Sequence, residues 1–115
     1  MINGKNLVVN SVSGKVLVYD VNKLARVATG EEAPAVYTGH RSTFFTKATC
    51  QDGIVTCGSQ DKYVYVWSDP SHVVRLGSGE SRASGHLHEV NEVSVTHDCL
   101  LSASDDASVL VWPLV

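Results

Sequence analysis

The chain has 115 residues, of which 43% are hydrophobic, and its nine Lys and Arg against twelve Asp and Glu leave a formal net charge of −3. This apolar content is enough for a buried core, and the charge argues against a nucleic-acid groove, which normally has a clustered basic face. No apolar run approaches the roughly 18 residues of a membrane span, and the first residues do not follow the pattern of a signal peptide. We therefore expect an intracellular protein, nuclear or cytoplasmic, in which Cys50, Cys57 and Cys99 are reduced.

A phrase of 13 residues occurs three times without a gap, at 7–19, 55–67 and 100–112. The three copies read LVVNSVSGKVLVY, VTCGSQDKYVYVW and LLSASDDASVLVW. Their closing aromatic residues, Tyr19, Trp67 and Trp112, are 48 and 45 residues apart (67 − 19 and 112 − 67). A period of roughly 40 to 45 residues is typical of a four-stranded β-propeller blade. The sequence predicts an all-β propeller fragment of about two and a half such blades, whereas a closed propeller needs about 4 to 8.

The strands are predicted from alternating apolar residues and from turn residues, in chain order. Residues 1–38 form a partial blade that lacks its first strand, because the chain begins only a few residues before Leu7. Residues 39–84 form a blade with strands at 44–49, 54–59 and 63–67, and with a fourth strand near 73–76 or later, just before Gly85. Residues 85–115 form a final blade of three strands, at 90–96, 100–104 and 108–112.

The two ends of the chain differ in how well they match the boundary of a propeller blade. Stopping just after a third strand is common for a propeller that borrows its last strand from elsewhere, but starting in the middle of a blade is not. The sequence therefore predicts the C-terminal portion of a longer protein. We expect the remaining propeller blades, or self-association, to cover its open edges.

Gly39-His40 and Gly85-His86 precede Trp67 and Trp112 by similar intervals (67 − 40 = 27 and 112 − 86 = 26), with Asp61 and Asp106 in the turns between. This pattern resembles the WD-repeat (WD40) β-propeller family. The resemblance implies a hydrogen-bonded network within each blade that joins the Gly-His histidine, a hydroxyl of the second strand, the turn aspartate and the tryptophan.

The resemblance assigns this network differently in the three blades. In the final blade it comprises His86, Ser102, Asp106 and Trp112, with Ser104 as an alternative hydroxyl. In the middle blade it comprises His40, Asp61 and Trp67; Cys57 stands where the serine would be, so Ser59 or Thr56 has to supply the hydroxyl, or the network is weaker. The first blade has Ser13 and Tyr19 in place of the aspartate and tryptophan, and we expect its network to be lost.

A narrower resemblance concerns residues 37–47, 57–61 and 64–67, and above all the Ser-Thr-Phe-Phe-Thr-Lys stretch at 42–47. These segments are similar to the late blades of the denticleless family, WD-repeat substrate receptors of a cullin-RING ubiquitin ligase. This resemblance implies a non-catalytic receptor that binds a target peptide on its loop face and has a ligase adaptor and substrates as partners. The arginine by which such receptors dock on the adaptor is missing after Tyr19, Trp67 and Trp112, so that contact would lie in other blades. The alternative is a general WD-repeat scaffold for another complex, in chromatin, RNA processing or trafficking.

Partner recognition is expected on the loops at the end of the blades where the Gly-His and turn Asp residues lie. Gln60 and Asp105 precede the turn aspartates, and Arg41 with Phe44 completes the predicted patch, whereas Phe45 is expected in the blade core. The sequence His86-Leu87-His88-Glu89 can be read as a metal site, but we prefer a network histidine followed by an exposed one. We therefore expect no enzyme activity, metal, cofactor, direct nucleic-acid contact or membrane contact.

Overall fold

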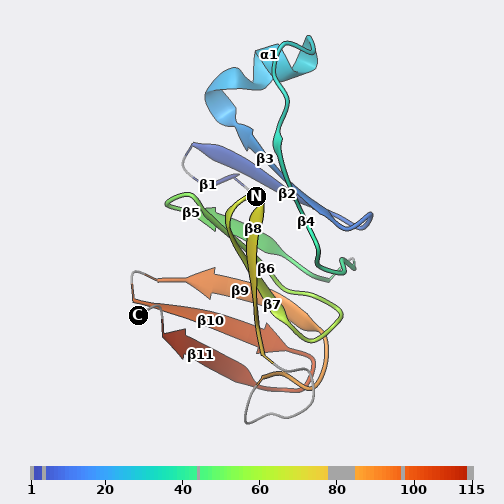
Figure 1. Cartoon of the computed structure of the whole chain (residues 1–115), viewed down its shortest axis with the longest axis vertical. Helices are drawn as coiled ribbons and strands as arrows, with labels where there is room; N and C mark the ends of the chain where they lie inside the picture. Colours follow the sequence, from blue (N-terminus) through green and yellow to red (C-terminus); the bar gives the residue numbers. More distant parts are fainter. Residues whose placement is uncertain (1, 4, 44, 78–84, 97, 114–115) are drawn as a thin grey trace.

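The computed structural model describes residues 2–3, 5–43, 45–77, 85–96 and 98–113. In these residues the strands form three antiparallel sheets, which Figure 1 shows one after another along the long axis of the molecule. The first sheet has the order β1 (Ile2–Asn3), β2 (Asn6–Ser11), β3 (Lys15–Asp20) and β4 (Ala35–Thr38). The second consists of β5 (Ala48–Gln51), β6 (Ile54–Cys57), β7 (Val64–Asp69) and β8 (His72–Leu76). The third has β9 (Val90–Val95), β10 (Cys99–Ser104) and β11 (Val109–Pro113).

The 13-residue phrase folds into the same hairpin in each sheet. Its first and last residues pair across the two strands, as Leu7 with Tyr19, Val55 with Trp67 and Leu100 with Trp112. The alternating apolar residues place one face of each hairpin in the core, as expected for antiparallel strands. The all-β prediction of blade-like sheets is confirmed.

Two strand predictions differ from the structure. The first sheet does have an innermost strand, because two residues in β1 pair with β2. The inner strand of the second sheet begins at Ala48 rather than at residue 44. Before it, the Thr46 hydroxyl accepts from the N–H of Thr43 at 3.0 Å and donates to the Thr43 carbonyl at 3.1 Å. These local side-chain bonds stabilise a turn that competes with the strand.

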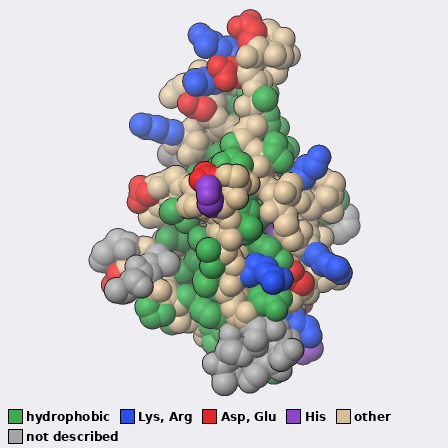
Figure 2. All heavy atoms as spheres, in the orientation of Figure 1, with side chains coloured by type: hydrophobic (Ala, Val, Ile, Leu, Met, Phe, Trp, Pro, Cys, Tyr) green, Lys and Arg blue, Asp and Glu red, His purple; other side chains and the backbone are tan. Residues whose placement is uncertain are grey.

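The remaining elements lie at the margins of the sheets. The outer strand β8 occupies the first of the two predicted places, and the second place falls within 78–84, outside the described residues. Between β3 and β4 the chain makes a short helical excursion, η1 (Val21–Lys23) and α1 (Leu24–Ala28), which protrudes at one end in Figure 1. Figure 2 shows charged side chains gathered on this excursion and hydrophobic ones over the middle of the same face. No helix in the described part of the chain is long and apolar enough to cross a membrane.

The core lies between the sheets, so the middle sheet is covered on both sides. Val55, Trp67 and other side chains pack against Val8 and Val16 of the first sheet, and Val64 packs against Val90 and Val93 of the third. Burying each large apolar side chain contributes about 1.5–3 kcal/mol. The second and third sheets approach closely at Gly58, where a β-carbon would lie 2.0 Å from the carbonyl oxygen of Val90. Only glycine fits this position without a shift of one sheet.

Candidate functional site

In the third sheet, three buried polar side chains and the indole N–H of one half-buried tryptophan form a continuous hydrogen-bonded network. His86 lies directly before β9, Ser102 is on β10, Asp106 is in the following turn and Trp112 is on β11. The His86 Nε2 atom lies 2.7 Å from the Ser102 hydroxyl, and its Nδ1 lies 3.1 Å from Oδ2 of Asp106. The indole N–H of Trp112 donates to the same hydroxyl at 2.8 Å. All four groups are satisfied if the serine O–H donates to Nε2 and the Nδ1–H donates to the carboxylate.

Asp106 is the most heavily bonded member of this network. Its carboxylate accepts from His86, from the N–H of Leu87 at 2.9 Å, and from both the N–H (2.9 Å) and the hydroxyl of Ser108. Burial raises the pKa of Asp106, but the hydrogen bonds from Ser108, Leu87 and His86 outweigh it and hold the pKa well below its usual range. The network therefore fixes the turn between β10 and β11 against the loop before β9.

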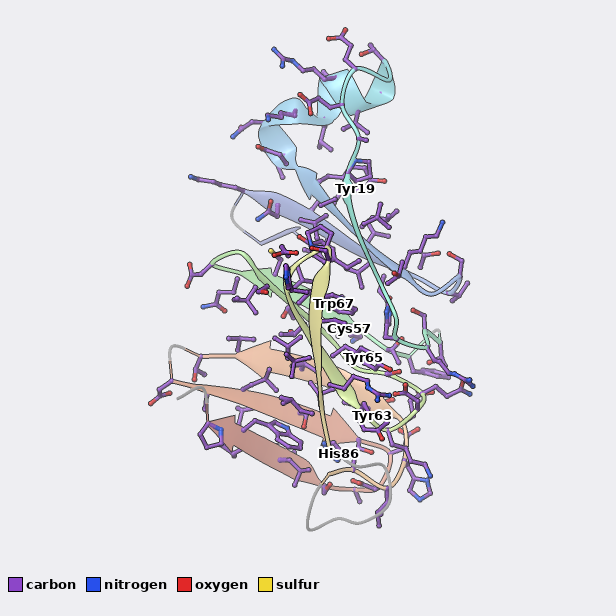
Figure 3. The ribbon with its side chains drawn as sticks, in the orientation of Figure 1. Tyr19, Cys57, Tyr63, Tyr65, Trp67 and His86 are labelled. Atoms are coloured by element: carbon purple, nitrogen blue, oxygen red, sulfur yellow. The ribbon has the colours of Figure 1, made fainter. Side chains whose placement is uncertain are left out.

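In the second sheet the side chains of His40, Ser59, Asp61 and Trp67 are not linked by the hydrogen bonds seen in the third sheet. The rings of His40 and Trp67 do meet edge to face, with 5.3 Å between their centroids, and the N–H of Asp61 donates to the Ser59 hydroxyl at 3.4 Å. Cys57, which occupies the place of Ser102, is fully buried and has no hydroxyl to offer. The Trp67 N–H donates instead to the backbone carbonyl of Thr38 at 3.1 Å. Figure 3 shows Cys57 and Trp67 together with Tyr65 in the middle sheet.

The other members of the expected middle network have different partners. Asp61 accepts from the hydroxyl of Tyr65 and from the N–H of Tyr63. Ser59 accepts from the N–H of Arg41 at 2.9 Å. Thr56, the alternative hydroxyl, lies 2.7 Å from the hydroxyl of Thr49.

His40 turns toward the first sheet. Its Nε2 lies 2.9 Å from the amide oxygen of Asn10 on β2 and 2.8 Å from the hydroxyl of Ser42. Its Nδ1 is buried and has no hydrogen-bond partner within the described residues. Burial lowers the pKa of His40, and the charge of Asp61 offsets this only in part. Asn10 also donates to the carbonyl and to the hydroxyl of Thr46, both at 2.9 Å, so it ties the first sheet to the loop before β5.

In the first sheet, Ser13 and Tyr19 stand where the turn aspartate and the tryptophan of the third sheet are. Ser13 is exposed, and its hydroxyl lies 2.8 Å from that of Ser11. Tyr19 is half-buried on β3.

The cysteines and the His-Leu-His-Glu segment have ordinary surroundings. Burial raises the pKa of the Cys57 thiol to about 12 and also raises that of Cys50, which disfavours the nucleophilic thiolate. Within the described residues no three His, Cys, Asp or Glu side chains gather as they would around a metal ion. In the suggested metal segment, His86 belongs to the buried network and His88 is exposed.

The residues of the predicted partner patch are exposed on one set of connected loops. Arg41, Gln60 and Asp105 are all exposed, and Phe44 lies outside the described residues. The Gln60 N–H donates to the Arg41 carbonyl at 2.9 Å, and the Asp105 N–H donates to the carbonyl of Glu89 at 3.1 Å. Phe45 was expected in the core, but 70% of it is exposed, because the turn closed by Thr43 and Thr46 directs it outward.

A hollow of about 430 Å³ lies beside these loops, where the second and third sheets meet. It is lined by Phe45, Lys47, Asn91, Glu92 and Asp105. The Lys47 N–H donates to the Asn91 carbonyl at 2.8 Å, which brings the start of the inner strand β5 against β9. Sequence reasoning missed Lys47, Asn91 and Glu92. The available signal was that Asn91 and Glu92 lie near the start of a predicted inner strand, whereas Lys47 was placed inside a predicted strand and in fact directly precedes β5.

Three relatives illustrate the similarity of this chain to known proteins. The WD repeat-containing protein 26 homolog of Drosophila melanogaster is 37% identical over 83 residues, which are 66% of this chain and 12% of the relative. The small ribosomal subunit protein RACK1 of Schizosaccharomyces pombe is 30% identical over 84 residues, 70% of this chain and 27% of the relative. F-box/WD repeat-containing protein 5 of Rattus norvegicus is 28% identical over 99 residues, 84% of this chain and 16% of the relative. The chain therefore spans between 12% and 27% of the length of these relatives. No family model matches the chain.

Two solved structures of designed proteins share the fold. The computationally designed Ika8 protein aligns with a TM-score of 0.69 at 19% identity, over 99% of this chain and 32% of that one. The designed Ika4 protein aligns with a TM-score of 0.53 at 18% identity, over 99% of this chain and 88% of that one. At these identities the likeness concerns the fold alone. The repeated hairpin register, the three antiparallel sheets and the WD-repeat relatives together identify this chain as a portion of a WD40 β-propeller.

Proposed function

We propose that this chain is a non-catalytic protein-interaction module that binds a partner peptide on its loop face. The loop face is defined by Arg41, Gln60 and Asp105. The observation that carries the proposal is that these three exposed side chains lie on turns held by backbone hydrogen bonds to a neighbouring loop. A charged and polar surface on a rigid support is well suited to specific recognition.

The support for the loop face extends across two sheets. The Ser59 carbonyl, next to Gln60, accepts from the N–H of Val90 at 2.9 Å, and the Ser59 hydroxyl accepts from the N–H of Arg41. In the third sheet the buried His86 network holds the turn that follows Asp105. Binding on preorganised loops avoids much of the entropy cost of ordering them.

For the whole protein we propose a substrate receptor of a cullin-RING ubiquitin ligase. The similarity of residues 42–47 to the denticleless family supports this proposal, as does the likeness to F-box/WD repeat-containing protein 5. The second candidate is a scaffold in another assembly, which is favoured by the likeness to a small ribosomal subunit protein. In either case the chemistry of ubiquitin transfer or of any other reaction belongs to partner subunits.

Affinity purification of the intact protein from its native cells, followed by mass spectrometry, tests these proposals. A triple variant with Arg41, Gln60 and Asp105 changed to Ala should lose its main partner. The matched control changes Lys23, Gln51 and Glu31 to Ala; these are also one basic, one amide and one acidic side chain, all exposed.

The two candidates give different results in this experiment. Cullin and adaptor subunits in stoichiometric amount support the receptor, and another stable complex supports the scaffold. The interaction proposal is refuted if the unaltered protein retains no partner, or if the control variant loses the partner as fully as the loop-face variant does.

A further inference from the structure

The hollow between the second and third sheets has an unusual combination of side chains. It is lined by one strongly exposed aromatic ring, Phe45, by two carboxylates, Glu92 and Asp105, and by one ammonium group, Lys47. The three charged side chains are also exposed. A surface aromatic beside carboxylates that outnumber the one ammonium group indicates a place where a partner side chain could replace water.

We propose that this hollow binds one basic side chain, arginine or lysine, of a partner peptide, with the apolar residue next to it packed on Phe45. The inference rests on the proposed protein-interaction function and names the partner chemistry of the loop face. The reasons concern the charge of the hollow, the rigidity of its walls and the position of the aromatic ring.

Charge favours a single cation. The lining carries two carboxylates against one ammonium group, and within the described residues neither Glu92 nor Lys47 forms an ion pair. A guanidinium group supplies five N–H donors and matches carboxylate geometry well. Lys47 on the same wall disfavours a second basic residue. The two carboxylates repel phosphate groups, which argues against a nucleic acid or a phosphopeptide as the occupant.

The Asp105 carboxylate, on the acidic side of the hollow, is already held in position in the unbound chain. The Asn91 side-chain N–H donates to one carboxylate oxygen of Asp105 at 2.6 Å, and the backbone of Asp105 is bonded to Glu89. The other carboxylate oxygen of Asp105 makes no hydrogen bond in the described part of the chain. A carboxylate fixed in this way can accept from a ligand without a large loss of side-chain entropy.

The aromatic wall is equally constrained. The N–H of Phe45 donates to the hydroxyl of Thr43 at 3.1 Å, and the buried Thr46 closes the same turn. The ring is therefore presented outward by a hydrogen-bonded turn rather than by a free loop. An aromatic ring next to carboxylates can pack against the aliphatic part of a basic side chain and can make a cation–π contact with its charged group.

Fluorescence polarisation with labelled peptide pools tests this proposal on the full chain. One pool has a fixed central Arg-Leu pair and randomised flanks, and matched pools carry citrulline-Leu, Glu-Leu or Arg-Gly at the centre. We expect the Arg-Leu pool to bind about tenfold more tightly than the citrulline-Leu pool, because citrulline keeps the shape and loses the charge-assisted hydrogen bonds. Raising the salt to about 0.3 M should weaken binding.

Substitutions of the residues that line the hollow test whether these residues are responsible for the binding. Glu92→Gln and Asp105→Asn should each weaken the Arg-Leu pool about threefold or more, and Phe45→Ala should remove the preference for Arg-Leu over Arg-Gly. Glu31→Gln is the matched charge control, since Glu31 is an exposed carboxylate near the helical excursion, and it should leave binding unchanged. Unfolding midpoints of all variants show whether each remains folded.

Several results overturn the inference. They are equal binding of the arginine and citrulline pools, tighter binding of the glutamate pool, absence of binding by every pool, or normal binding by a folded Glu92→Gln, Asp105→Asn double variant. In the purification experiment, a partner retained by that double variant refutes the hollow as its site while the interaction function stands. No partner on the unaltered protein refutes the interaction function itself.

Discussion

Replacing Asp106 with Ala should destabilise the chain by removing the acceptor at the centre of the third-sheet network. The Asp106 carboxylate accepts from the His86 ring, from the N–H of Leu87 and from Ser108. The His86 side chain is fully buried, so when the carboxylate is gone its Nδ1–H has the Ser108 hydroxyl, 3.1 Å away, as its remaining acceptor instead of a charged group. The groups of Leu87 and Ser108 are half-buried and can be rehydrated in part.

The expected magnitude follows from the four donors that lose this acceptor: the Nδ1–H of His86, the N–H of Leu87, and the N–H and hydroxyl of Ser108. An unsatisfied buried donor costs about 1–3 kcal/mol, and the partly rehydrated groups cost less, so we expect a total of about 3 kcal/mol. For 115 residues, an unfolding entropy of about 2.1 cal/mol/K per residue converts this loss into a fall in Tm of about 12 °C. Asp106→Asn keeps one carbonyl acceptor and should cost about half as much.

Urea unfolding followed by tryptophan fluorescence measures this change, because Trp112 is a member of the network. Asp105→Ala is the matched control: it removes the neighbouring carboxylate, which is exposed, and should change the free energy of unfolding by less than about 1 kcal/mol. A midpoint for Asp106→Ala within error of the unaltered chain, or an equal loss for Asp105→Ala, would refute the reasoning.

The low pKa of Asp106 also predicts that the free energy of unfolding decreases at acidic pH. The folded chain holds this carboxylate ionised below its ordinary pKa of 3.8, so the unfolded chain takes up the proton first. Stability from Asp106 is therefore present above about pH 4 and is lost as the pH falls further toward the folded-state pKa. In Asp106→Asn this part of the acid slope should disappear, and an unchanged slope would contradict the assignment.

The other predictions concern the remaining network atoms, the middle sheet and the contact between sheets. Ser102→Cys should cost about 1–3 kcal/mol in urea unfolding, because a ring nitrogen and an indole N–H both lose their partner, whereas Ser94→Cys at an exposed position should change little. Burial lowers the pKa of His40 from 6.5, so stability should fall as the pH drops below about 6.5; His40→Gln should flatten this slope, and His88→Gln at an exposed site should not. Gly58→Ala should cost about 3 kcal/mol by thermal unfolding, because the new β-carbon would lie 2.0 Å from a backbone carbonyl of β9; a loss below about 0.5 kcal/mol would contradict this packing.

Local sequence patterns were sufficient for most of the strands. The hairpins that end in Tyr19, Trp67 and Trp112 depend on alternation and on turn residues within a stretch of 13 residues, so their register was predictable without the neighbouring sheets. The start of β5 was not, because the threonine side chains at 43 and 46 form a turn in a segment whose residue types favour a strand. The two-residue strand β1 was too short to show a periodic pattern.

Some contacts of the candidate site residues could be predicted from the sequence and others could not. A family resemblance, combined with the sequence spacing, predicted a network of His86, Ser102, Asp106 and Trp112. The structure places their polar atoms within hydrogen-bond distance. The similar spacing in the middle blade, where the sequence allowed a weaker network, is accompanied by different hydrogen bonds. Cys57 removes the hydroxyl that His40 would need, and the ring turns to another sheet instead.

The repeat, the hairpins and the positions of the closing aromatics were predictable from the amino-acid sequence, because each of these follows from residues close together along the chain. Three features became visible only in the folded chain: His40 is hydrogen-bonded to Asn10, Phe45 is exposed, and Lys47 and Asp105 line one hollow. Two of these features join residues of neighbouring sheets, whose contacts are set by packing and by hydrogen bonds between sheets. Phe45 is exposed because the Thr43 and Thr46 side chains stabilise a turn, and the alternation of apolar and polar residues does not reveal such a turn.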